Sequence, residues 1–122
     1  MGPERKLWHE LKRNTPQIRW TRIENTSLLG TPDLLGYNTS GRFFTVELKV
    51  TKSNKVKFSP HQIAFHITHP KNSYILVKSL DQSDLKLFPG TEIQPLVACG
   101  FRLEACSLGL KSIIEKLEAC GL

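Results

Sequence analysis

Residues 31–50 constrain the fold of this chain more than any other stretch, because they predict a hairpin. Thr31-Pro32 favours extended backbone, since the residue before a proline is pushed out of the α region. Residues 38–41 (Asn-Thr-Ser-Gly) form a turn cluster, and residues 42–50 are rich in β-branched and aromatic side chains. Two antiparallel strands, over residues 34–37 and 42–50, are therefore expected around one tight loop.

The register of this hairpin brings two carboxylates together. Opposed residues of an antiparallel pair are equally far from the centre of the loop, so a loop centred on Ser40 places Asp33 opposite Glu47, with Cβ atoms about 5 Å apart. Facing carboxylates repel each other unless a cation lies between them. Glu47 shares its strand face with Thr45 and Lys49, and this face should line a cleft or meet solvent. The other face is apolar and belongs to the core: Phe44, Val46, Leu48 and Val50.

The rest of the chain predicts one α/β domain over residues 1–122, a mixed β-sheet flanked by helices. Helices are expected over residues 4–14, from Ser59-Pro60 to Pro70 and over 107–119, and further strands over 18–24, 74–78 and 85–88. The first helix places Leu7, Trp8 and Leu11 on one face, and Trp8 and Trp20 are expected to be core residues. The alternation of side chains in residues 18–24 does not decide which face of this strand is buried.

The net charge of +6 lies entirely in the half of the chain that holds the carboxylate pair. Residues 1–57 carry eleven Lys and Arg against five Asp and Glu, whereas residues 58–122 carry six of each. A basic surface beside an acidic site suits a polyanion such as DNA, although mild basicity is also common on ordinary solvated surfaces. No apolar run approaches the ~20 residues of a membrane span, and the charged N-terminus has no signal core. We therefore expect an intracellular protein, in which the three cysteines stay reduced.

Asp33, Glu47 and Lys49 together fit metal-assisted hydrolysis of a phosphodiester. Two carboxylates hold hard divalent cations such as Mg²⁺ or Mn²⁺, which activate water and neutralise phosphate charge. A lysine beside them can orient or deprotonate the attacking water. The backbone carbonyl of Leu48 is a further candidate ligand. The three histidines at positions 61, 66 and 69 do not share a helix face, so zinc is not expected.

The order Gly30-Thr31-Pro32-Asp33, then Val46-Glu47-Leu48-Lys49, resembles the signature of the PD-(D/E)xK nuclease superfamily. Arg22-Ile23-Glu24-Asn25 before the first motif and Ser59-Pro60-His61-Gln62 after the second extend the resemblance. The arrangement is similar to small phage-type and virus-type replication-repair nucleases and, more distantly, to archaeal Holliday-junction resolvases and some homing endonucleases. It covers roughly residues 4–80 and implies a restriction-endonuclease-like core, a viral origin, and a Mg²⁺- or Mn²⁺-dependent DNA endonuclease that leaves 5′-phosphates. Branched or junction DNA is among its candidate substrates.

The resemblance also implies a further acidic metal ligand and a glutamine near the lysine. For this further ligand, Glu24 at the end of its strand is favoured over Glu10 on the first helix. Either residue could instead be an ordinary surface carboxylate. Gln62 matches the family glutamine, which touches substrate or orients the lysine. A capping box with Ser59 explains Gln62 equally well.

Arg22 and the basic connector over residues 52–57 are the candidate contacts to DNA. If the connector lies along the cleft, its three lysines, Lys52, Lys55 and Lys57, would contact phosphates. Otherwise the connector is a flexible solvated loop.

Three other functional interpretations remain open at the level of sequence. The carboxylate–lysine cluster could be a structural ion pair, since exposed strands often carry Glu-x-Lys. The domain could bind DNA without cutting it, or it could be a nuclease subunit that is active only within a larger complex. Cleavage of both strands of a duplex or junction would require a homodimer with two sites.

Overall fold

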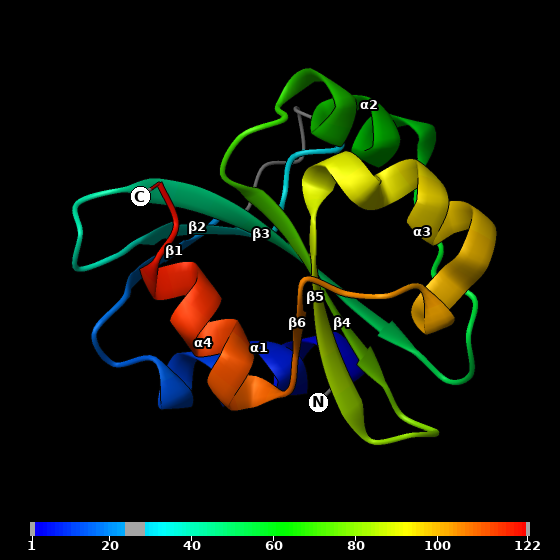
Figure 1. The fold of residues 1–122 in the computed structure, drawn as a ribbon, viewed down its shortest axis with the longest axis horizontal. Coiled ribbons are helices and arrows are strands. Elements are labelled where there is room, and N and C mark those ends of the chain that lie inside the picture. Colours follow the sequence, from blue (N-terminus) through cyan, green and yellow to red (C-terminus); the bar gives the residue numbers. More distant parts are fainter. Residues whose placement is uncertain (1, 24–28, 122) are drawn as a thin grey trace.

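A mixed β-sheet carries helices on both of its faces, as expected for an α/β domain (Figure 1). The computed structural model describes residues 2–23 and 29–121, and within them the sheet has six strands that follow one another in chain order. Among these described strands, only β3 and β4 run parallel, and helix α2 connects them. The strands are β1 (Arg19–Arg22), β2 (Leu34–Tyr37), β3 (Phe43–Thr51), β4 (Ser73–Ser79), β5 (Asp84–Pro89) and β6 (Ser107–Leu108). The helices are α1 (Pro3–Asn14), α2 (Pro60–Thr68), α3 (Ile93–Cys99) and α4 (Leu110–Glu118), with 3₁₀ turns at Gly90–Glu92 and Gly100–Arg102.

The β2–β3 hairpin has the predicted register. Leu34 lies opposite Val46, and Tyr37 lies opposite Phe43, so the loop is centred on Ser40. The continuation of this register sets Asp33 against Glu47. The mixed sheet and the hairpin expected from the sequence are therefore confirmed.

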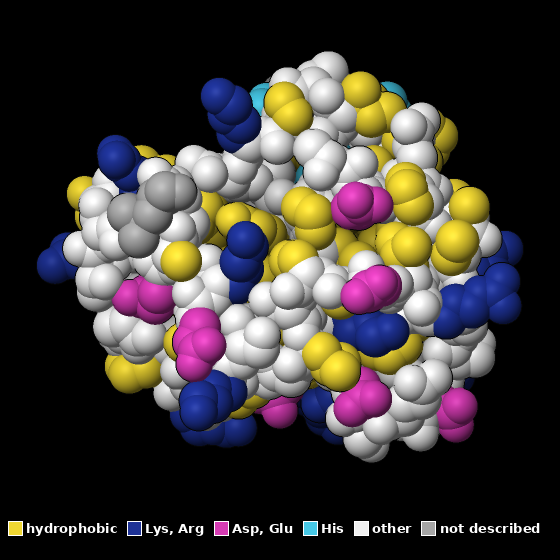
Figure 2. Space-filling view, viewed as in Figure 1, with side chains coloured by type: hydrophobic (Ala, Val, Ile, Leu, Met, Phe, Trp, Pro, Cys, Tyr) yellow, Lys and Arg dark blue, Asp and Glu magenta, His cyan; other side chains and the backbone are white. Residues whose placement is uncertain are grey.

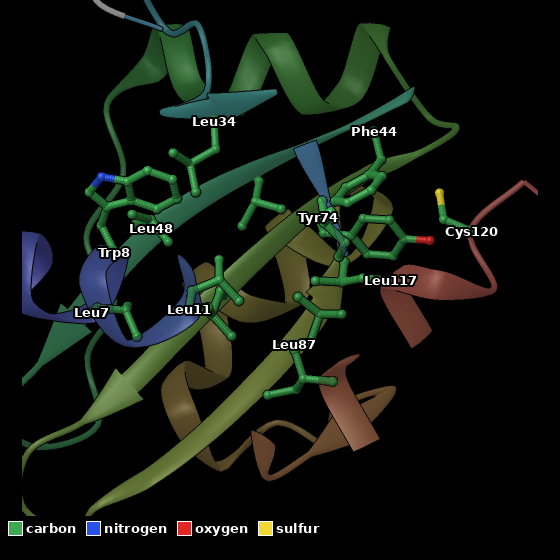
Figure 3. Packing of buried hydrophobic residues seen from close by; sticks show 14 residues of the cluster. Leu7, Trp8, Leu11, Leu34, Phe44, Leu48, Tyr74, Leu87, Leu117 and Cys120 are labelled. Carbon is green, nitrogen blue, oxygen red and sulfur yellow. The ribbon is translucent and has the colours of Figure 1, made fainter. Parts of the chain in front are cut away.

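Helices α1 and α4 cover one face of the sheet and enclose the larger hydrophobic cluster (Figure 3). The predicted apolar face of α1 is buried here, with Leu7 and Leu11 each 1% exposed. Trp8 packs edge-to-face on Trp20 at 6.0 Å between ring centroids. Trp20 belongs to the half-buried rim of the cluster, and with Ile18 it shows which side of β1 is buried.

Helices α2 and α3 cover the other face over β4 and β5. A second cluster joins Ile75, Val77 and Phe88 of these strands to Ile93 and Leu96 of α3. No residue of β1 or β2 belongs to this second cluster among the residues that the structure places. The two clusters thus lie between the layers of a three-layer α/β/α arrangement. In the described part of the chain, the helical layer formed by α2 and α3 does not extend over β1 and β2.

Asn38 ties the hairpin loop to the end of α4. Its side-chain amide donates to the carbonyls of Leu117 at 3.0 Å and Cys120 at 3.3 Å, and its Oδ1 accepts from the backbone N–H of Arg42 at 3.0 Å. A buried amide therefore satisfies carbonyls that a helix C-terminus leaves without partners. The β2–β3 hairpin is in this way anchored to the C-terminal helix, outside the segment that carries the family resemblance.

Apart from shifts of one or two residues at the ends of elements, the structure differs from the expected elements in residues 18–24 and 93–108. Residues 107–108 form strand β6 rather than the start of a helix, because Gly109 adopts φ 84° and separates them from α4. Helix α3 was not predicted, since it is short and lacks a side-chain cap. The strand expected over 18–24 is observed from Arg19 to Arg22, and Glu24 lies outside the described residues. In the described part of the chain, every helix is too short or too polar to cross a bilayer.

Candidate metal and nucleic-acid site

The site lies next to Leu34, the first residue of β2, which pairs with Val46 of β3. Beyond Val46, β3 continues to Thr51 without β2 as a neighbour. If the hairpin register continued, Leu48 would pair with Pro32, but proline has no N–H to donate to the Leu48 carbonyl. The side chain of Asp33 takes over part of the pairing, since its Oδ2 accepts from the Leu48 N–H at 2.8 Å. The chain thus holds the Asp33 carboxylate at the mouth of the hairpin, beside a carbonyl that β2 does not pair.

Glu47 is the buried carboxylate of the site. The residue is 3% exposed, and its Oε1 has no hydrogen-bond partner within the described ranges. Burial, followed by the charge of Asp33 and a hydrogen bond with it, raises the pKa of Glu47 to about 9, and Lys49 acts in the opposite direction. Asp33 and Glu47 therefore interact as the register predicted, at a position where the ionised pair is unfavourable without a cation.

Gln62 connects the lysine to the buried carboxylate. Its Oε1 accepts from Lys49 Nζ at 3.0 Å, and its Nε2 donates to Glu47 Oε2 at 3.3 Å. The same Oε1 accepts from the backbone N–H of Ser59 at 2.9 Å, and the Gln62 N–H donates to Ser59 Oγ at 3.2 Å. The capping box and the contact with the lysine are both present, so the two interpretations of Gln62 are not exclusive. Lys49 also lies 4.8 Å from the ring centroid of Phe58.

Helix α1 contributes a carboxylate that sequence reasoning missed, Glu4. The pKa of Glu4 is raised by burial and by the charge of Asp33, and Lys49 lowers it, so Glu4 belongs to the same electrostatic cluster. Glu10, the predicted candidate on this helix, lies 3.5 Å from Lys78 Nζ on β4. The two glutamates are six residues apart, so they lie about 9 Å apart along the helix axis. No local signal distinguishes Glu4, because an acidic residue is common in the first turn of a helix.

The basic connector borders a hollow that also contains part of the site. A cavity of about 550 Å³ is lined by Glu4 and Lys49 together with all three connector lysines, Lys52, Lys55 and Lys57. Arg22 lines a separate hollow of about 50 Å³ with Glu4 and Asp33. The structure thus brings the predicted cationic residues to the two sides of the carboxylate cluster.

Asn54 holds the connector in place. Its Nδ2 donates to the Cys99 carbonyl at 2.8 Å, and its Oδ1 accepts from the Arg102 N–H at 2.8 Å. The Asn54 carbonyl accepts from the Phe101 N–H at 2.7 Å. Gly100, at φ 76°, allows this approach, because a Cβ at that position would lie 2.4 Å from Asn54. The lysines are therefore displayed by an anchored loop rather than by a free one.

The donor set suits a hard divalent cation. Among residues 2–23 and 29–121, no three Asp, Glu, His or Cys side chains converge on one point, so protein carboxylates alone do not complete a site. Mg²⁺ keeps several of its waters and needs only one or two carboxylates. The Oε1 of Glu47, which has no partner within the described ranges, the facing Asp33 carboxylate and the Leu48 carbonyl are oxygen donors of the type that Mg²⁺ prefers.

The face seen in Figure 2 has a different character over α3, where acidic side chains lie among hydrophobic ones. Glu92 and Glu104 line a hollow on this side of the molecule. Negative charge at this surface repels a polyanion. The basic hollow beside Lys49 is thus the better surface for nucleic acid.

One solved structure with a similar fold is that of Archaeoglobus fulgidus Hjc, a Holliday junction resolvase from an archaeal hyperthermophile. It aligns with a TM-score of 0.52 and 20% sequence identity, over 72% of this chain and 73% of that chain. No protein-family model matches this chain, and no curated protein matches it either. The restriction-endonuclease-like architecture and the resemblance to Holliday-junction resolvases are therefore confirmed at the level of the fold.

Proposed function

We propose that this chain is a divalent-metal-dependent DNA endonuclease of the PD-(D/E)xK type that acts on branched DNA. The observation that carries the proposal is the Asp33–Glu47–Lys49 cluster on a resolvase-like fold, with a buried carboxylate oxygen that lacks a partner among the described residues. A structural Glu47–Lys49 ion pair does not account for the cluster, because Lys49 Nζ donates to Gln62 and the buried Glu47 faces a second carboxylate.

Asp33, Glu47 and the Leu48 carbonyl would hold the cation, with Glu4 on the same side of the cluster. When bound, Mg²⁺ or Mn²⁺ supplies an activated water and charge neutralisation at the scissile phosphate. Asp33 is oriented for this role by the Leu48 N–H at 2.8 Å. Glu24 and Glu10 remain candidate ligands from the sequence, and Glu4 is the alternative that the fold brings to the cluster.

Lys49 would orient the attacking water and offset the negative charge that develops on the phosphate. Gln62 limits the freedom of its ammonium group through the 3.0 Å hydrogen bond, so the lysine is positioned before substrate arrives. Lys52, Lys55 and Lys57 would contact phosphates along the 550 Å³ hollow, and Arg22 would do so on the Asp33 side.

Branched DNA is the favoured substrate because the fold resembles that of a Holliday junction resolvase. A single site cuts one strand, so resolution of a junction by this chain would use a homodimer. An intracellular location, in a viral or cellular setting, follows from this proposed action on DNA.

Cleavage of a DNA panel tests the proposal. Supercoiled plasmid, linear duplex, four-way junction, flap and single strand would be incubated with Mg²⁺, Mn²⁺ or EDTA, and wild type compared with Lys49→Ala. Lys111→Ala, an exposed lysine on α4, is the matched control. We expect metal-dependent cutting, strongest on the junction, that falls by about 10²-fold or more in Lys49→Ala and is unchanged in the control.

A folded wild-type protein that binds the junction but cuts nothing with either metal would overturn the stand-alone enzyme. It would leave the non-catalytic module or a subunit that needs a larger complex. Equal cutting by wild type and Lys49→Ala would instead point to a contaminating nuclease.

A further inference from the structure

Among the described residues, no helix covers the sheet face that carries Glu47 over β1, β2 and Phe43 of β3. Helices α2 and α3 pack on this face over β4 and β5, and their hydrophobic cluster includes no described residue of β1 or β2. In Figure 1 the hairpin at the left extends beyond both helices. An open surface hollow of about 380 Å³ lies over these strands. It is lined by Arg19, Thr21, Leu35, Gly36, Tyr37 and Phe43.

Two aromatic rings dominate this hollow. Tyr37 and Phe43 are register partners on β2 and β3, their ring centroids lie 4.6 Å apart, and they are 37% and 57% exposed. Arg19 pairs with Tyr37 in the sheet and lies on its other side. The lining residues include a cation and no acidic side chain, which suits an anionic ligand with flat apolar parts.

The hollow lies on the same face of the sheet as the proposed site. Phe43 and Glu47 lie on the same face of β3, four residues apart, which corresponds to about 13 Å along the strand. This distance spans about four stacked nucleotides at 3.4 Å each. A DNA strand that reaches the carboxylates can therefore extend over the aromatic pair.

We propose that Tyr37 and Phe43 form a stacking platform for unpaired nucleobases of the DNA substrate, with Arg19 contacting the adjoining phosphate. This inference rests on the proposed nuclease function and deepens it, because it names single-stranded character near the cut as the feature that is recognised. Base–aromatic stacking is tolerant of sequence, since every base has a π-face. The platform therefore selects a DNA structure rather than a base sequence.

A second copy of the chain fits this surface less well. A stable protein interface buries about 800 Å² on each partner. Aromatic side chains bury 150–250 Å² each, so the exposed parts of these two rings amount to roughly 200 Å². Nucleobases need no more area than the rings offer.

Binding without cleavage tests the platform. The full chain, in EDTA, would be titrated with a perfect duplex and with the same duplex interrupted by a short single-stranded gap that carries 2-aminopurine. Stacking quenches this base, so fluorescence reports the contact, and anisotropy reports affinity. We expect Tyr37→Ala/Phe43→Ala to lose the quench and about tenfold affinity for gapped DNA. Affinity for intact duplex should be nearly unchanged.

Controls separate stacking from folding. Phe43→Leu keeps an apolar side chain and should fold, yet it should lose most of the quench. Leu108→Ala removes a side chain on β6 that is 59% exposed, close to the 57% of Phe43. It should change neither the fluorescence quench nor the affinity.

Equal losses on both DNAs, or an unchanged quench in the double variant, would overturn the platform. A concentration-dependent dimer that the double variant abolishes would also overturn it and would identify a second copy as the occupant. Because no metal is present, failure of the platform is distinct from failure of the proposed nuclease, which the Lys49→Ala comparison reports.

Discussion

Gln62 accepts a hydrogen bond from Lys49 at 3.0 Å with the same Oε1 that accepts from the backbone of Ser59. One side chain therefore begins helix α2 and positions the lysine of the candidate site. A residue with two roles can be tested by comparing it with its capping partner, which has only one.

Gln62→Ala should reduce DNA cleavage by about tenfold or more, because Lys49 loses its hydrogen-bond acceptor. It should also cost about 1 kcal/mol of unfolding free energy through the lost cap. Ser59→Ala removes the cap side chain and leaves the contact with Lys49. It should show a similar stability loss with nearly normal cleavage. Equal cleavage by the two variants would contradict the positioning role.

Glu47→Gln should stabilise the metal-free protein at neutral pH by about 1–3 kcal/mol, because it removes the free-energy cost of protonating Glu47 when the chain folds. The folded pKa of about 9 lies above the ordinary value, so the folded state binds a proton that the unfolded state has released. Glu47 therefore lowers the stability of the wild type in EDTA as pH rises from about 4.5 to 9, and above about pH 6.5, where His66 is neutral in both states, this fall is unopposed by His66. Urea unfolding at several pH values measures this slope, which Glu47→Gln should abolish.

The same variant should lose stabilisation by metal. A ligand that binds only the native state stabilises it by RT ln(1 + L/Kd), where L is the free ligand concentration, and this raises the unfolding midpoint. Mn²⁺ should raise the Tm of wild type and leave that of Glu47→Gln unchanged. A rise in both proteins would place the bound ion elsewhere.

Glu4→Gln and Glu10→Gln distinguish the two α1 carboxylates. We expect Glu4→Gln to weaken Mn²⁺ binding, since the Glu4 carboxylate shares the electrostatic cluster of Asp33 and Lys49. Glu10→Gln should leave Mn²⁺ affinity unchanged and cost less than about 1 kcal/mol of stability, because its partner is Lys78 at a half-exposed position. Isothermal titration with Mn²⁺ measures the affinity, and thermal unfolding measures the stability. A larger loss of Mn²⁺ affinity in Glu10→Gln than in Glu4→Gln would identify Glu10 as the ligand.

Asn54→Ala should weaken DNA binding several-fold without removing any cation. The variant leaves the Arg102 N–H and the Cys99 carbonyl without their partner, which costs about 1–3 kcal/mol, and it frees the loop that displays Lys52, Lys55 and Lys57. Gln82→Ala, at an exposed position between β4 and β5 that does not line this hollow, is the control. Binding isotherms at several salt concentrations measure the effect. A normal affinity in Asn54→Ala would show that the loop needs no anchor.

His66 should make the protein sensitive to acid. It is fully buried, neither ring nitrogen has a partner among the described residues, and burial, with the charge of His69, lowers its pKa to about 4. Between pH 6.5 and 4 the unfolded state therefore binds the proton first, and stability falls as pH decreases. His66→Leu in the Glu47→Gln background should remove this slope in chemical unfolding. A slope that persists would assign the acid sensitivity to other groups.

Local patterns were enough to predict the carboxylate pair. The register of Asp33 against Glu47 follows from one tight turn and the alternation of one strand, and both are properties of neighbouring residues. Turn, proline and capping signals likewise predicted the hairpin and helix α2. The motif order pointed to the fold that the resolvase structure shares.

Long-range packing was required for the rest. Glu4 joins the site because α1 crosses β3, Asn54 is anchored because residues 99–102 return to the connector, and Asn38 caps a helix 79 residues away. The platform of Tyr37 and Phe43 exists because α2 and α3 end before they cover β1 and β2. Such placements depend on how helices pack across a sheet, which is the sum of many weak contacts between distant segments. No spacing along the chain encodes them, whereas the hairpin register is set within twenty residues of backbone.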